Sequence, residues 1–438
     1  MRRLKLHHWI LIAMLLGAAI GLPLNVLAAE GVLDTKLVRD IADVGKEIGG
    51  IFLRLLQMLV VPLIVASLIT GVTGMGDLRA LGKLGGRTIT FYLATSLLAI
   101  LTGILFVNLI DPGVGVDLGL LEAGAAEHVL PSVTEESQSL GAVLWAQLTS
   151  MIPKNPIHAA AEGDMLPIIF FSLAFGVFIA LVEHPASDDE ADPESSGNAA
   201  VVRRFFQGCF AVMMKMTLAV IRLAPIGVFG FMLYAAAGRG LDAFEALGWY
   251  ALTVAVALAF HAFLTLPFIY WVTTRRHAWE HARVMTPALL TAFSTASSNG
   301  TLPLTMQCVE QTGVPNKVGS FVLPLGATIN MDGTALYEAV AVLFIAQVYG
   351  MDLSLGQQGI VALTALLASV GAAGIPHAGT VMMVVVLTAV GLPTTAVGLI
   401  LAVDRILDMC RTTVNVWSDS IAASVVAKMT PEVAETST

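Results

Sequence analysis

Charged side chains are scarce in this chain. Of its 438 residues, 13% are Asp, Glu, Lys or Arg, 56% are hydrophobic, and the mean hydropathy is +0.82. A soluble domain carries about 25% charged residues, so this composition argues against a soluble globular protein and predicts a polytopic membrane protein in a lipid bilayer. The formal charge of −9 also lacks the basic surplus typical of nucleic-acid binding, and we expect no nucleic-acid partner.

Cysteine is scarce as well. Cys209, Cys308 and Cys410 lie far apart in apolar surroundings, without a CxxC or zinc-ligand spacing, so we expect packing residues and not a disulfide or zinc framework. The sequence also lacks HExxH, GxSxG, a Walker loop and a dinucleotide-binding fingerprint. We therefore predict no enzyme, and an intramembrane enzyme is the least favoured alternative.

One apolar stretch, residues 401–428, carries polar residues along its length. At about 100° per residue, five of them share an arc of roughly 80° on a helix: Asp404, Asp408, Arg411, Asn415 and Asp419. A charge at the bilayer centre costs about 2.5–3.5 kcal/mol, so this polar stripe is predicted to line a site inside the protein that binds or moves a charged species. The alternative is that Asp408 and Arg411, three residues apart, only neutralise each other.

Hydrophobic runs predict the order of the spans. Six precede residue 283, at residues 9–29, 48–73, 88–110, 140–182 (interrupted by prolines), 205–237 and 243–272. Lys and Arg cluster before the first span, between the second and third, and after the sixth, which places these segments in the cytoplasm by the positive-inside rule. A cleaved signal peptide is the alternative for the first run, although that run is longer than a usual signal sequence.

Two later apolar segments are interrupted by small polar residues, Gly and Pro. Residues 285–309 are broken at 294–303, and residues 360–390 are broken at 369–379. Because Gly and Pro disfavour a through-going helix, each segment is predicted to form a hairpin that enters and leaves the membrane on one side. Two interrupted segments in corresponding positions predict an inverted repeat with a binding site near the membrane midplane.

The span between these hairpins, residues 319–348, contains the polar sequence Asn330-Met331-Asp332-Gly333-Thr334. An unwound turn at Gly333 would expose oxygen ligands suited to a hard cation such as sodium; the alternative is a kink with Asp332 paired to an arginine. Glu338 lies on the same face as Thr334. Burial favours the protonated form of a carboxyl group, so Glu338 is a candidate proton carrier, and a solvated or salt-bridged glutamate is the alternative.

The histidines give no metal-ligand pattern. Five are expected at membrane ends as interfacial residues: His7, His8, His261, His277 and His281. His377, at the second hairpin tip, is expected to face solvent.

Taken together, these motifs resemble the sodium-coupled glutamate/aspartate transporter family, also called the dicarboxylate/amino acid:cation symporters, which includes the excitatory amino acid transporters. The similarity covers nearly the whole chain and is strongest from Thr286 to Lys428. It implies an all-α fold of eight transmembrane helices and two re-entrant hairpins with inverted repeats, forming a homotrimer that works by an elevator motion. The implied division is scaffold spans one and two at 1–87, span three of the transport domain at 88–112, scaffold spans four and five at 113–239, the rest of the transport domain at 240–430, and a cytoplasmic tail at 431–438.

The resemblance also implies a substrate site. Arg411 would clamp the side-chain carboxylate of the substrate with its planar fork, and Asp408 would accept hydrogen bonds from the amino group. Ser298 and Asn415 would hold the α-carboxylate. The full implied set is Ser297, Ser298, Met331, Thr334, Ile375, Gly379, Asp408, Arg411, Thr412 and Asn415, with Ile375 to Gly379 closing over the ligand as a gate.

Three sodium sites are implied in the same way. The first would use carbonyls of Gly326, Asn330 and Asn415 with the carboxylate of Asp419. The second would use Tyr92, Thr95, Ser96, Asn330 and Asp332, and the third Thr328, Ser369, Val370 and Ala372. The third would form only when the second hairpin closes, so that ion and substrate together would stabilise the closed state. Glu338 matches the carboxylate that carries the proton in glutamate-specific members, and potassium is a further coupled ion.

The sequence departs from the family pattern at Ala296 and Met409, where many members carry an arginine; Arg405 is the nearby candidate to replace it. We predict sodium-coupled symport of L-glutamate or L-aspartate, with proton symport and potassium counter-transport, in the plasma (inner) membrane with both termini cytoplasmic. A C4-dicarboxylate symporter and a neutral amino acid exchanger are the alternatives; Asp408 argues against the first and Arg411 against the second. An anion channel or sensor would not need the complete set of ion ligands.

Overall fold

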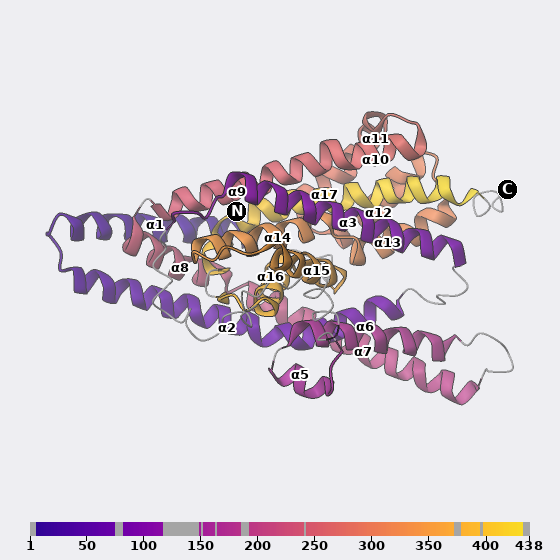
Figure 1. Ribbon diagram of the computed structural model, residues 1–438, viewed down its shortest axis with the longest axis horizontal. Coiled ribbons are helices and arrows are strands. Elements are labelled where there is room, and N and C mark those ends of the chain that lie inside the picture. The colour runs from indigo at the N-terminus through magenta and orange to yellow at the C-terminus, as the bar shows by residue number, and fades with distance from the viewer. Residues whose placement is uncertain are drawn as a thin grey trace, which may run out of the picture.

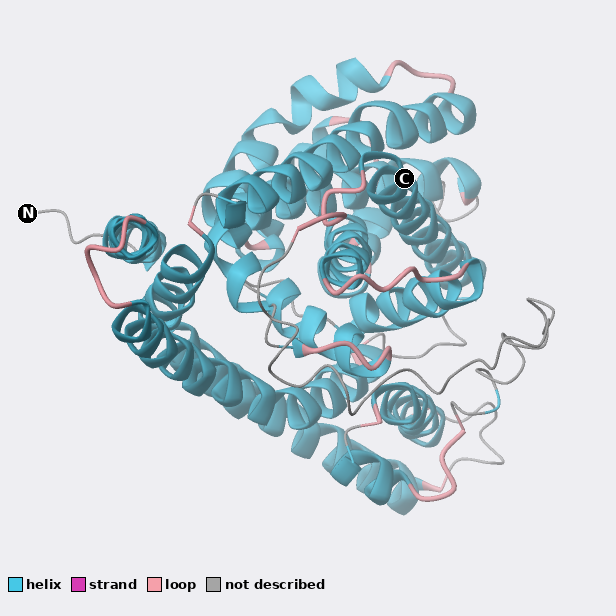
Figure 2. Ribbon diagram, turned by 60° about the vertical axis from the view of Figure 1, so that its left-hand side comes forward, coloured by secondary structure: helices cyan, strands magenta, loops and turns pink. Residues whose placement is uncertain are grey.

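The computed structural model describes residues 6–74, 82–116, 149, 152–162, 164–184, 192–240, 242–371, 378–394 and 397–431. Within these ranges the regular structure is helical and contains no strand, as predicted (Figure 2). The amino-terminal half contains α1 (Leu6–Ala29), α2 (Thr35–Thr73), α3 (Gly82–Ile110), α5 (Pro156–Glu162), α6 (Met165–Glu183), α7 (Pro193–Ile221) and α8 (Ala224–Arg239). The carboxyl-terminal half contains α9 (Asp242–Phe260), the π-helical segment η2 (His261–Thr265), α10 (Leu266–Thr274), α11 (Ala278–Thr295), α12 (Ser298–Gln311), α13 (Asn316–Ile329), α14 (Asp332–Val348), α15 (Leu355–Gly371), α16 (Ala378–Ala389) and α17 (Val397–Met429).

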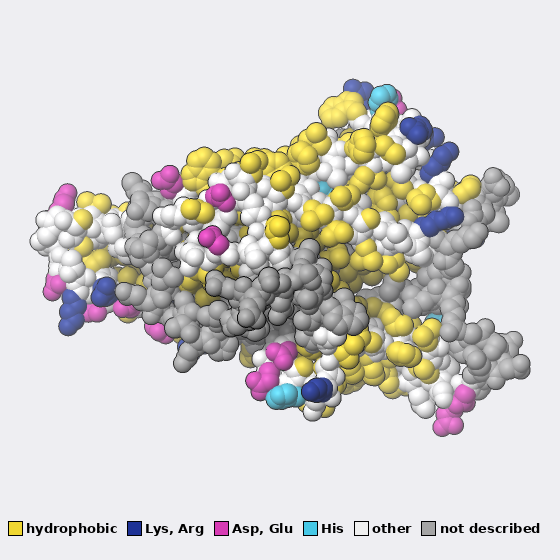
Figure 3. All heavy atoms as spheres, viewed as in Figure 1, with side chains coloured by type: hydrophobic (Ala, Val, Ile, Leu, Met, Phe, Trp, Pro, Cys, Tyr) yellow, Lys and Arg dark blue, Asp and Glu magenta, His cyan; other side chains and the backbone are white. Residues whose placement is uncertain are grey.

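Several of these helices have the length and apolar composition of membrane spans. In the described part of the chain there are 5 such segments, at His8–Ala29, Leu84–Ile110, Glu194–Ile221, Phe244–Thr274 and Asn316–Val348. On the face shown in Figure 3, hydrophobic side chains predominate over the middle of the molecule, and Lys and Arg side chains gather at the end where α10 and α11 lie. Exposed large apolar residues such as Leu109 and Phe263 are what lipid-facing helices require. The chain is thus a multi-pass membrane protein.

The helices α1, α2 and α8 pack closely through small residues (Figure 1). A Cβ atom added at Gly17 of α1 would lie 2.9 Å from the Cβ of Met232, and one at Gly230 of α8 would lie 2.5 Å from the carbonyl oxygen of Gly45 on α2. Small residues allow helix backbones to approach in membranes, where van der Waals packing replaces the hydrophobic effect between helices. These glycines therefore allow the three helices to pack closely against one another.

The predicted fifth span, residues 205–237, is divided into two helices. The first, α7, ends at Ile221, and α8 begins at Ala224 with Pro225 in its first turn. A proline has no backbone N–H and its ring clashes with the carbonyl group four residues earlier, which here belongs to Ile221. The predicted span therefore consists of two helices joined at residues 222–223.

The first of the two polar interruptions in the carboxyl-terminal half is a helix break. Ala296 adopts a left-handed conformation with φ of 51°, and Ser297 caps α12 by accepting a hydrogen bond from the Gly300 N–H. The flanking helices α11 and α12 pack on each other. The second break lies between α15 and α16, and its tip at residues 372–377 lies outside the described residues.

The span that contains Asp332 is also interrupted, as predicted. Helix α13 ends at Ile329 and α14 begins at Asp332, so Asn330 and Met331 form the unwound turn. The break precedes Gly333, which lies within the first turn of α14. Helix α14 is buried along nearly its whole length and packs against α3 and α17 (Figure 1). The helices that flank these breaks, α11, α12, α13 and α14, pack against α17. The polar residues of the breaks therefore lie in the same part of the protein as the polar stripe of α17.

Candidate functional site

Helix α17 carries the polar stripe predicted from the sequence, and the stripe faces the protein interior. Its residues are at most 4% exposed: Asp404, Asp408, Arg411, Asn415 and Asp419. The helix contacts α9, α11, α13 and α14, which screen these side chains from lipid. The prediction that they line an internal polar region is confirmed.

Arg411 is paired with two carboxylates. Its Nη2 atom lies 2.9 Å from Asp408 Oδ1 and 3.1 Å from Asp404 Oδ1, and its Cζ atom lies 3.8 Å from the centre of the Tyr337 ring, in reach of a cation–π interaction. The Nε and Nη1 atoms are buried without a hydrogen-bond partner. A buried unsatisfied donor costs about 1–3 kcal/mol, so a role limited to neutralising Asp408 leaves the Nε–H and the two N–H groups of Nη1 unexplained.

Asp404 is held in place by hydrogen bonds from two other helices, α14 and α16. Tyr337 of α14 donates its hydroxyl to Asp404 Oδ1 over 2.9 Å, and Thr380 of α16 donates to Oδ2 over 2.9 Å. Next to Thr380, a Cβ atom at Gly379 would lie 2.9 Å from Arg411 Nη1. The absence of a side chain at Gly379 therefore keeps the space beside the free N–H groups open.

Asn415 joins the start of α14 to α17. Its Oδ1 atom accepts a hydrogen bond of 2.8 Å from the Gly333 N–H, one of the amides that a helix amino terminus leaves without a partner. Its Nδ2 atom donates to Thr334 Oγ1 over 3.2 Å. A Cβ atom at Gly333 would lie 2.6 Å from the Arg411 carbonyl oxygen, so glycine is required for this close approach of the two helices.

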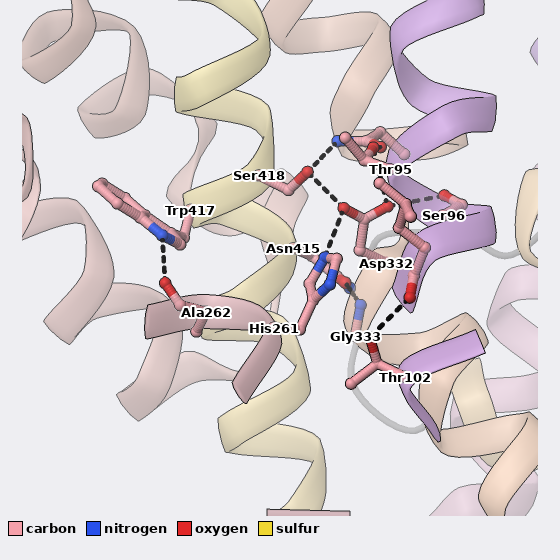
Figure 4. A network of polar contacts seen from close by, with 12 residues as sticks. Thr95, Ser96, Thr102, His261, Ala262, Asp332, Gly333, Asn415, Trp417 and Ser418 are labelled. Atoms are coloured by element: carbon pink, nitrogen blue, oxygen red, sulfur yellow. Dashed lines mark hydrogen bonds and ion pairs between the residues drawn. The ribbon is translucent and has the colours of Figure 1, made fainter. Parts of the chain in front are cut away.

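Asp332 lies at the centre of a second, hydroxyl-rich cluster (Figure 4). Its Oδ1 atom accepts hydrogen bonds from Ser96 over 2.7 Å and Thr95 over 3.3 Å on α3. Its Oδ2 atom accepts one from Ser418 over 2.6 Å on α17 and lies 3.2 Å from His261 Nε2. Asp332 is thus partnered by a histidine and three hydroxyl groups, and no arginine contacts it in the described part of the chain, so the alternative of an arginine partner is wrong.

Asn330 connects this cluster to Asp419. Its Nδ2 atom donates to Ser418 Oγ over 3.0 Å and to Asp419 Oδ1 over 2.9 Å. A Cβ atom at Gly326 would collide with Asp419 Oδ1 and lie 2.9 Å from the Tyr92 hydroxyl. The structure therefore brings together eight of the predicted sodium ligands, from α3, α13, α14 and α17: Tyr92, Thr95, Ser96, Gly326, Asn330, Asp332, Asn415 and Asp419.

Other predicted ligands lie near these clusters without joining their hydrogen bonds. The hydroxyls of Thr328 and Ser369 donate within their own helices, to Leu325 O over 2.9 Å and Leu366 O over 2.9 Å. Thr328 and Val370 also line a cleft of about 320 Å³ between α2, α12, α13 and α15. Ser298, Met331 and Thr412 are buried in α12, the α13–α14 turn and α17. Ile375 and Ala372 lie outside the described residues.

Glu338 is fully buried in α14, and both of its carboxyl oxygens lack a hydrogen-bond partner. The alternative of a solvated or salt-bridged glutamate is therefore wrong. An ionised carboxyl group is costly to bury without a partner, which keeps Glu338 a candidate for proton transfer.

Two histidines expected at membrane ends are in the interior. His261 is 0% and His281 3% exposed, and His281 Nε2 lies 3.2 Å from Ser420 Oγ. Both interfacial assignments are wrong, because distance from the end of an apolar run does not say which face of the helix is buried. Ser418 and Thr380 were also missed, and their only signal is a hydroxyl within an apolar helix.

No group of three or more His, Cys, Asp and Glu side chains converges within the described ranges in a way that could hold a metal ion. The acceptors gathered around Asp332 and Asp419 are carboxylate, hydroxyl and amide oxygens, the ligand type of hard cations. The site therefore combines a guanidinium, which can bind an anion, with a set of oxygen atoms, which can bind cations.

Known proteins resemble this chain over most of its length. The sequence model described as the sodium:dicarboxylate symporter family matches residues 6–429. The chain is 36% identical to the proton/glutamate-aspartate symporter of Escherichia coli K12 over 87% of this chain and 84% of that protein. It is 34% identical to the proton/sodium-glutamate symport protein of Geobacillus stearothermophilus over 98% and 95%, and 37% identical to excitatory amino acid transporter 4 of Mus musculus over 86% and 76%. The chain belongs to the sodium:dicarboxylate symporter family.

Proposed function

We propose that this protein is a secondary active transporter that couples sodium entry to the uptake of L-glutamate or L-aspartate. The observation that carries the proposal is the buried Arg411, whose Nε and Nη1 atoms lack partners while Nη2 is held by Asp404 and Asp408. Guanidinium N–H groups bind a carboxylate through charge-assisted hydrogen bonds. The names of the relatives, two of them glutamate symport proteins, support the same substrate class.

The substrate would bind at α17 with its side-chain carboxylate on Arg411. Its ammonium group would face Asp408, with Thr412 beside it, so the site selects an amino acid over a plain diacid. Asn415 and Ser298 would hold the α-carboxylate. Buried positions around this space support the remaining assignments: Met331, Thr334 and Gly379, with Ser297 at the α11–α12 break and Ile375 in the gate.

Three sodium ions would accompany the substrate. The cluster around Asp332, with Tyr92, Thr95, Ser96 and Asn330, would hold one. The second would lie at Asp419 with Gly326, Asn330 and Asn415. The third would lie between the α13 end and the α15 end, at Thr328, Ser369, Val370 and Ala372; the cleft that Thr328 and Val370 share supports this position. Binding of the third ion and closure of the gate would depend on each other.

Glu338 would carry the coupled proton, because it is buried without a partner one turn beyond Thr334. Potassium would return through the same site after the substrate leaves. Neither ion requires a further cluster of ligands in this proposal.

The protein would work as a homotrimer by an elevator motion in the plasma (inner) membrane, with both termini cytoplasmic. Eight spans and two re-entrant hairpins would divide into a scaffold (1–87 and 113–239), a transport domain (88–112 and 240–430) and a tail (431–438). The close packing of α1, α2 and α8 supports a rigid scaffold. The packing of α11 on α12 about the Ala296–Ser297 break supports the first hairpin.

Uptake into proteoliposomes under an inward sodium gradient tests this function. Labelled aspartate, glutamate, serine and succinate are compared, with potassium or choline inside and with Asp332→Asn as the matched control. Sodium-dependent uptake of aspartate or glutamate is expected, faster with internal potassium and weakened in the control. Entry of succinate or serine alone would refute the acidic amino acid assignment, and acidic uptake indifferent to potassium would remove counter-transport only.

A further inference from the structure

The helix formed by α9 and α10 is widened at its middle by one π-helical turn, η2, which begins at His261. A π turn loosens the regular ladder of helix hydrogen bonds, and such turns occur frequently at functional sites. The carbonyl oxygen of Ala262 accepts a hydrogen bond of 3.1 Å from Trp417 Nε1 on α17 (Figure 4). Trp417 thereby holds the widened turn against α17.

The imidazole of His261 is completely buried and points at the Asp332 carboxylate (Figure 4). Its Nε2 atom lies 3.2 Å from Asp332 Oδ2. A carboxylate only accepts hydrogen bonds, so Nε2 carries the proton and donates it. The other ring nitrogen, Nδ1, has no hydrogen-bond partner. The contact with Asp332 is therefore the polar contact that holds the ring.

The two oxygens of Asp332 have different surroundings. Oδ2 receives the His261 N–H and the Ser418 hydroxyl, the latter over 2.6 Å. Oδ1 faces only hydroxyl groups of α3, those of Ser96 and Thr95. A hydroxyl has both a donor and acceptor lone pairs and rotates freely, so the α3 hydroxyls can turn their lone pairs toward a cation. The Nε2–H group has no such freedom and remains a donor.

We propose that His261 is a positioning residue for the cation site at Asp332. It fixes Oδ2 together with Ser418, so that Oδ1, Thr95 and Ser96 are presented to sodium in one orientation. Because Trp417 and Ser418 are adjacent, α17 both holds the η2 turn and supplies the second donor to Oδ2. The inference rests on the proposed sodium coupling and extends it to a helix that contributes no ligand.

The residue type fits this role. A lysine or arginine at this position would also donate to Oδ2, but its fixed positive charge would repel the cation at short range in a low-dielectric interior. A side chain with a hydroxyl or amide group at this position could present either a donor or an acceptor to Oδ2. The ring supplies one rigid N–H donor whose orientation is set by the π turn.

The test measures sodium binding without substrate, as the sodium concentration that gives half-maximal thermal stabilisation of the purified protein. The variants are His261→Leu, which removes the donor, and His261→Gln, which retains an N–H. His281→Leu is the matched control, because His281 is also buried and contacts Ser420 and the Trp417 ring but not Asp332; it also shows whether loss of a neighbour of Trp417 is enough to lower the affinity. Mutation of a residue that orients a metal ligand typically lowers the affinity for the metal ion by about 10–100-fold.

We expect a loss of that size in His261→Leu, partial recovery in His261→Gln, and no change in His281→Leu. Wild-type affinity in His261→Leu would overturn the inference, as would an equal loss in His261→Gln, which would indicate a packing effect. If His261→Leu is not monodisperse, His261→Asn takes its place in the test. The asparagine side chain is too short to reach Oδ2 of Asp332, so the same loss of sodium affinity is expected.

Asp332→Asn separates this inference from the proposed function. If the wild type is not stabilised by sodium, or if Asp332→Asn titrates like the wild type, the sodium site itself is wrong. If Asp332→Asn loses affinity and His261→Leu does not, only the role of His261 is wrong.

Discussion

Substitution of Arg411 by cysteine removes two buried nitrogens that have no hydrogen-bond partner in the protein, Nε and Nη1. If the side-chain carboxylate of the substrate accepts two hydrogen bonds from the guanidinium, each charge-assisted bond contributes about 1.5–3 kcal/mol, and the variant loses about 3–6 kcal/mol of binding free energy. At 1.4 kcal/mol per factor of ten, affinity for glutamate and aspartate falls by about two to four orders of magnitude.

The same substitution leaves two carboxylates without their shared cation. Asp404 and Asp408 are 1% and 4% exposed, and removal of one partner from a buried ion pair costs about 3–5 kcal/mol. Arg411→Cys therefore also lowers the free energy of unfolding, and size-exclusion chromatography must accompany every affinity measurement. Arg411→Lys keeps the charge but not the planar fork, and should recover stability more than acidic substrate affinity.

The assay is equilibrium binding and proteoliposome uptake of labelled glutamate, aspartate and serine. The matched control is Arg203→Cys, because Arg203 also forms an ion pair, with Glu183 at 2.8 Å, but on α7 and α6 away from α17. Arg411→Cys should lose acidic uptake and admit neutral amino acids, while the control behaves as the wild type. Unchanged glutamate affinity in a monodisperse Arg411→Cys protein would refute the carboxylate-clamp role.

Three further substitutions test other parts of the site. Asp419→Asn should raise the sodium concentration required for half-maximal uptake, and an unaltered sodium titration would remove Asp419 from the ion site. Glu338→Gln should retain substrate exchange but lose the pH dependence of net uptake; a wild-type pH profile would exclude proton transfer by this residue. Gly333→Ala places a Cβ atom 2.6 Å from the Arg411 carbonyl; the resulting overpacking costs about 1–3 kcal/mol and should weaken substrate binding measurably, whereas Gly248→Ala, in open space, should not.

Much of this site could be predicted because charge is so costly in a membrane. The polar stripe of α17 and the break before Asp332 both violate the pattern of an apolar span, and each violation occurs where the structure places a buried polar cluster. The α11–α12 break is equally visible, since Ser, Gly and Pro interrupt an otherwise apolar run. The all-helical fold follows from the same composition.

What could not be predicted depends on helix rotation and on local irregularity. A π turn has no composition of its own, so nothing in the sequence marked η2 or turned His261 toward Asp332. The position of the α7–α8 break could not be read from Pro225 alone, because prolines are common in membrane helices and only some of them end one. Ser418 resembles any hydroxyl in a helix until Asn330 and Asp332 are placed beside it.

The side-chain amide of Asn330 connects the two proposed cation positions. Both of its N–H groups are in use, one toward Ser418 beside Asp332 and the other toward Asp419. The amide bonds directly to the Asp419 carboxylate and reaches Asp332 through the Ser418 hydroxyl, so it connects the two carboxylates. Linkage is reciprocal, so under the proposed sodium assignment any shift that an ion at one position causes in the affinity of the other is matched by an equal shift that an ion at the second position causes at the first.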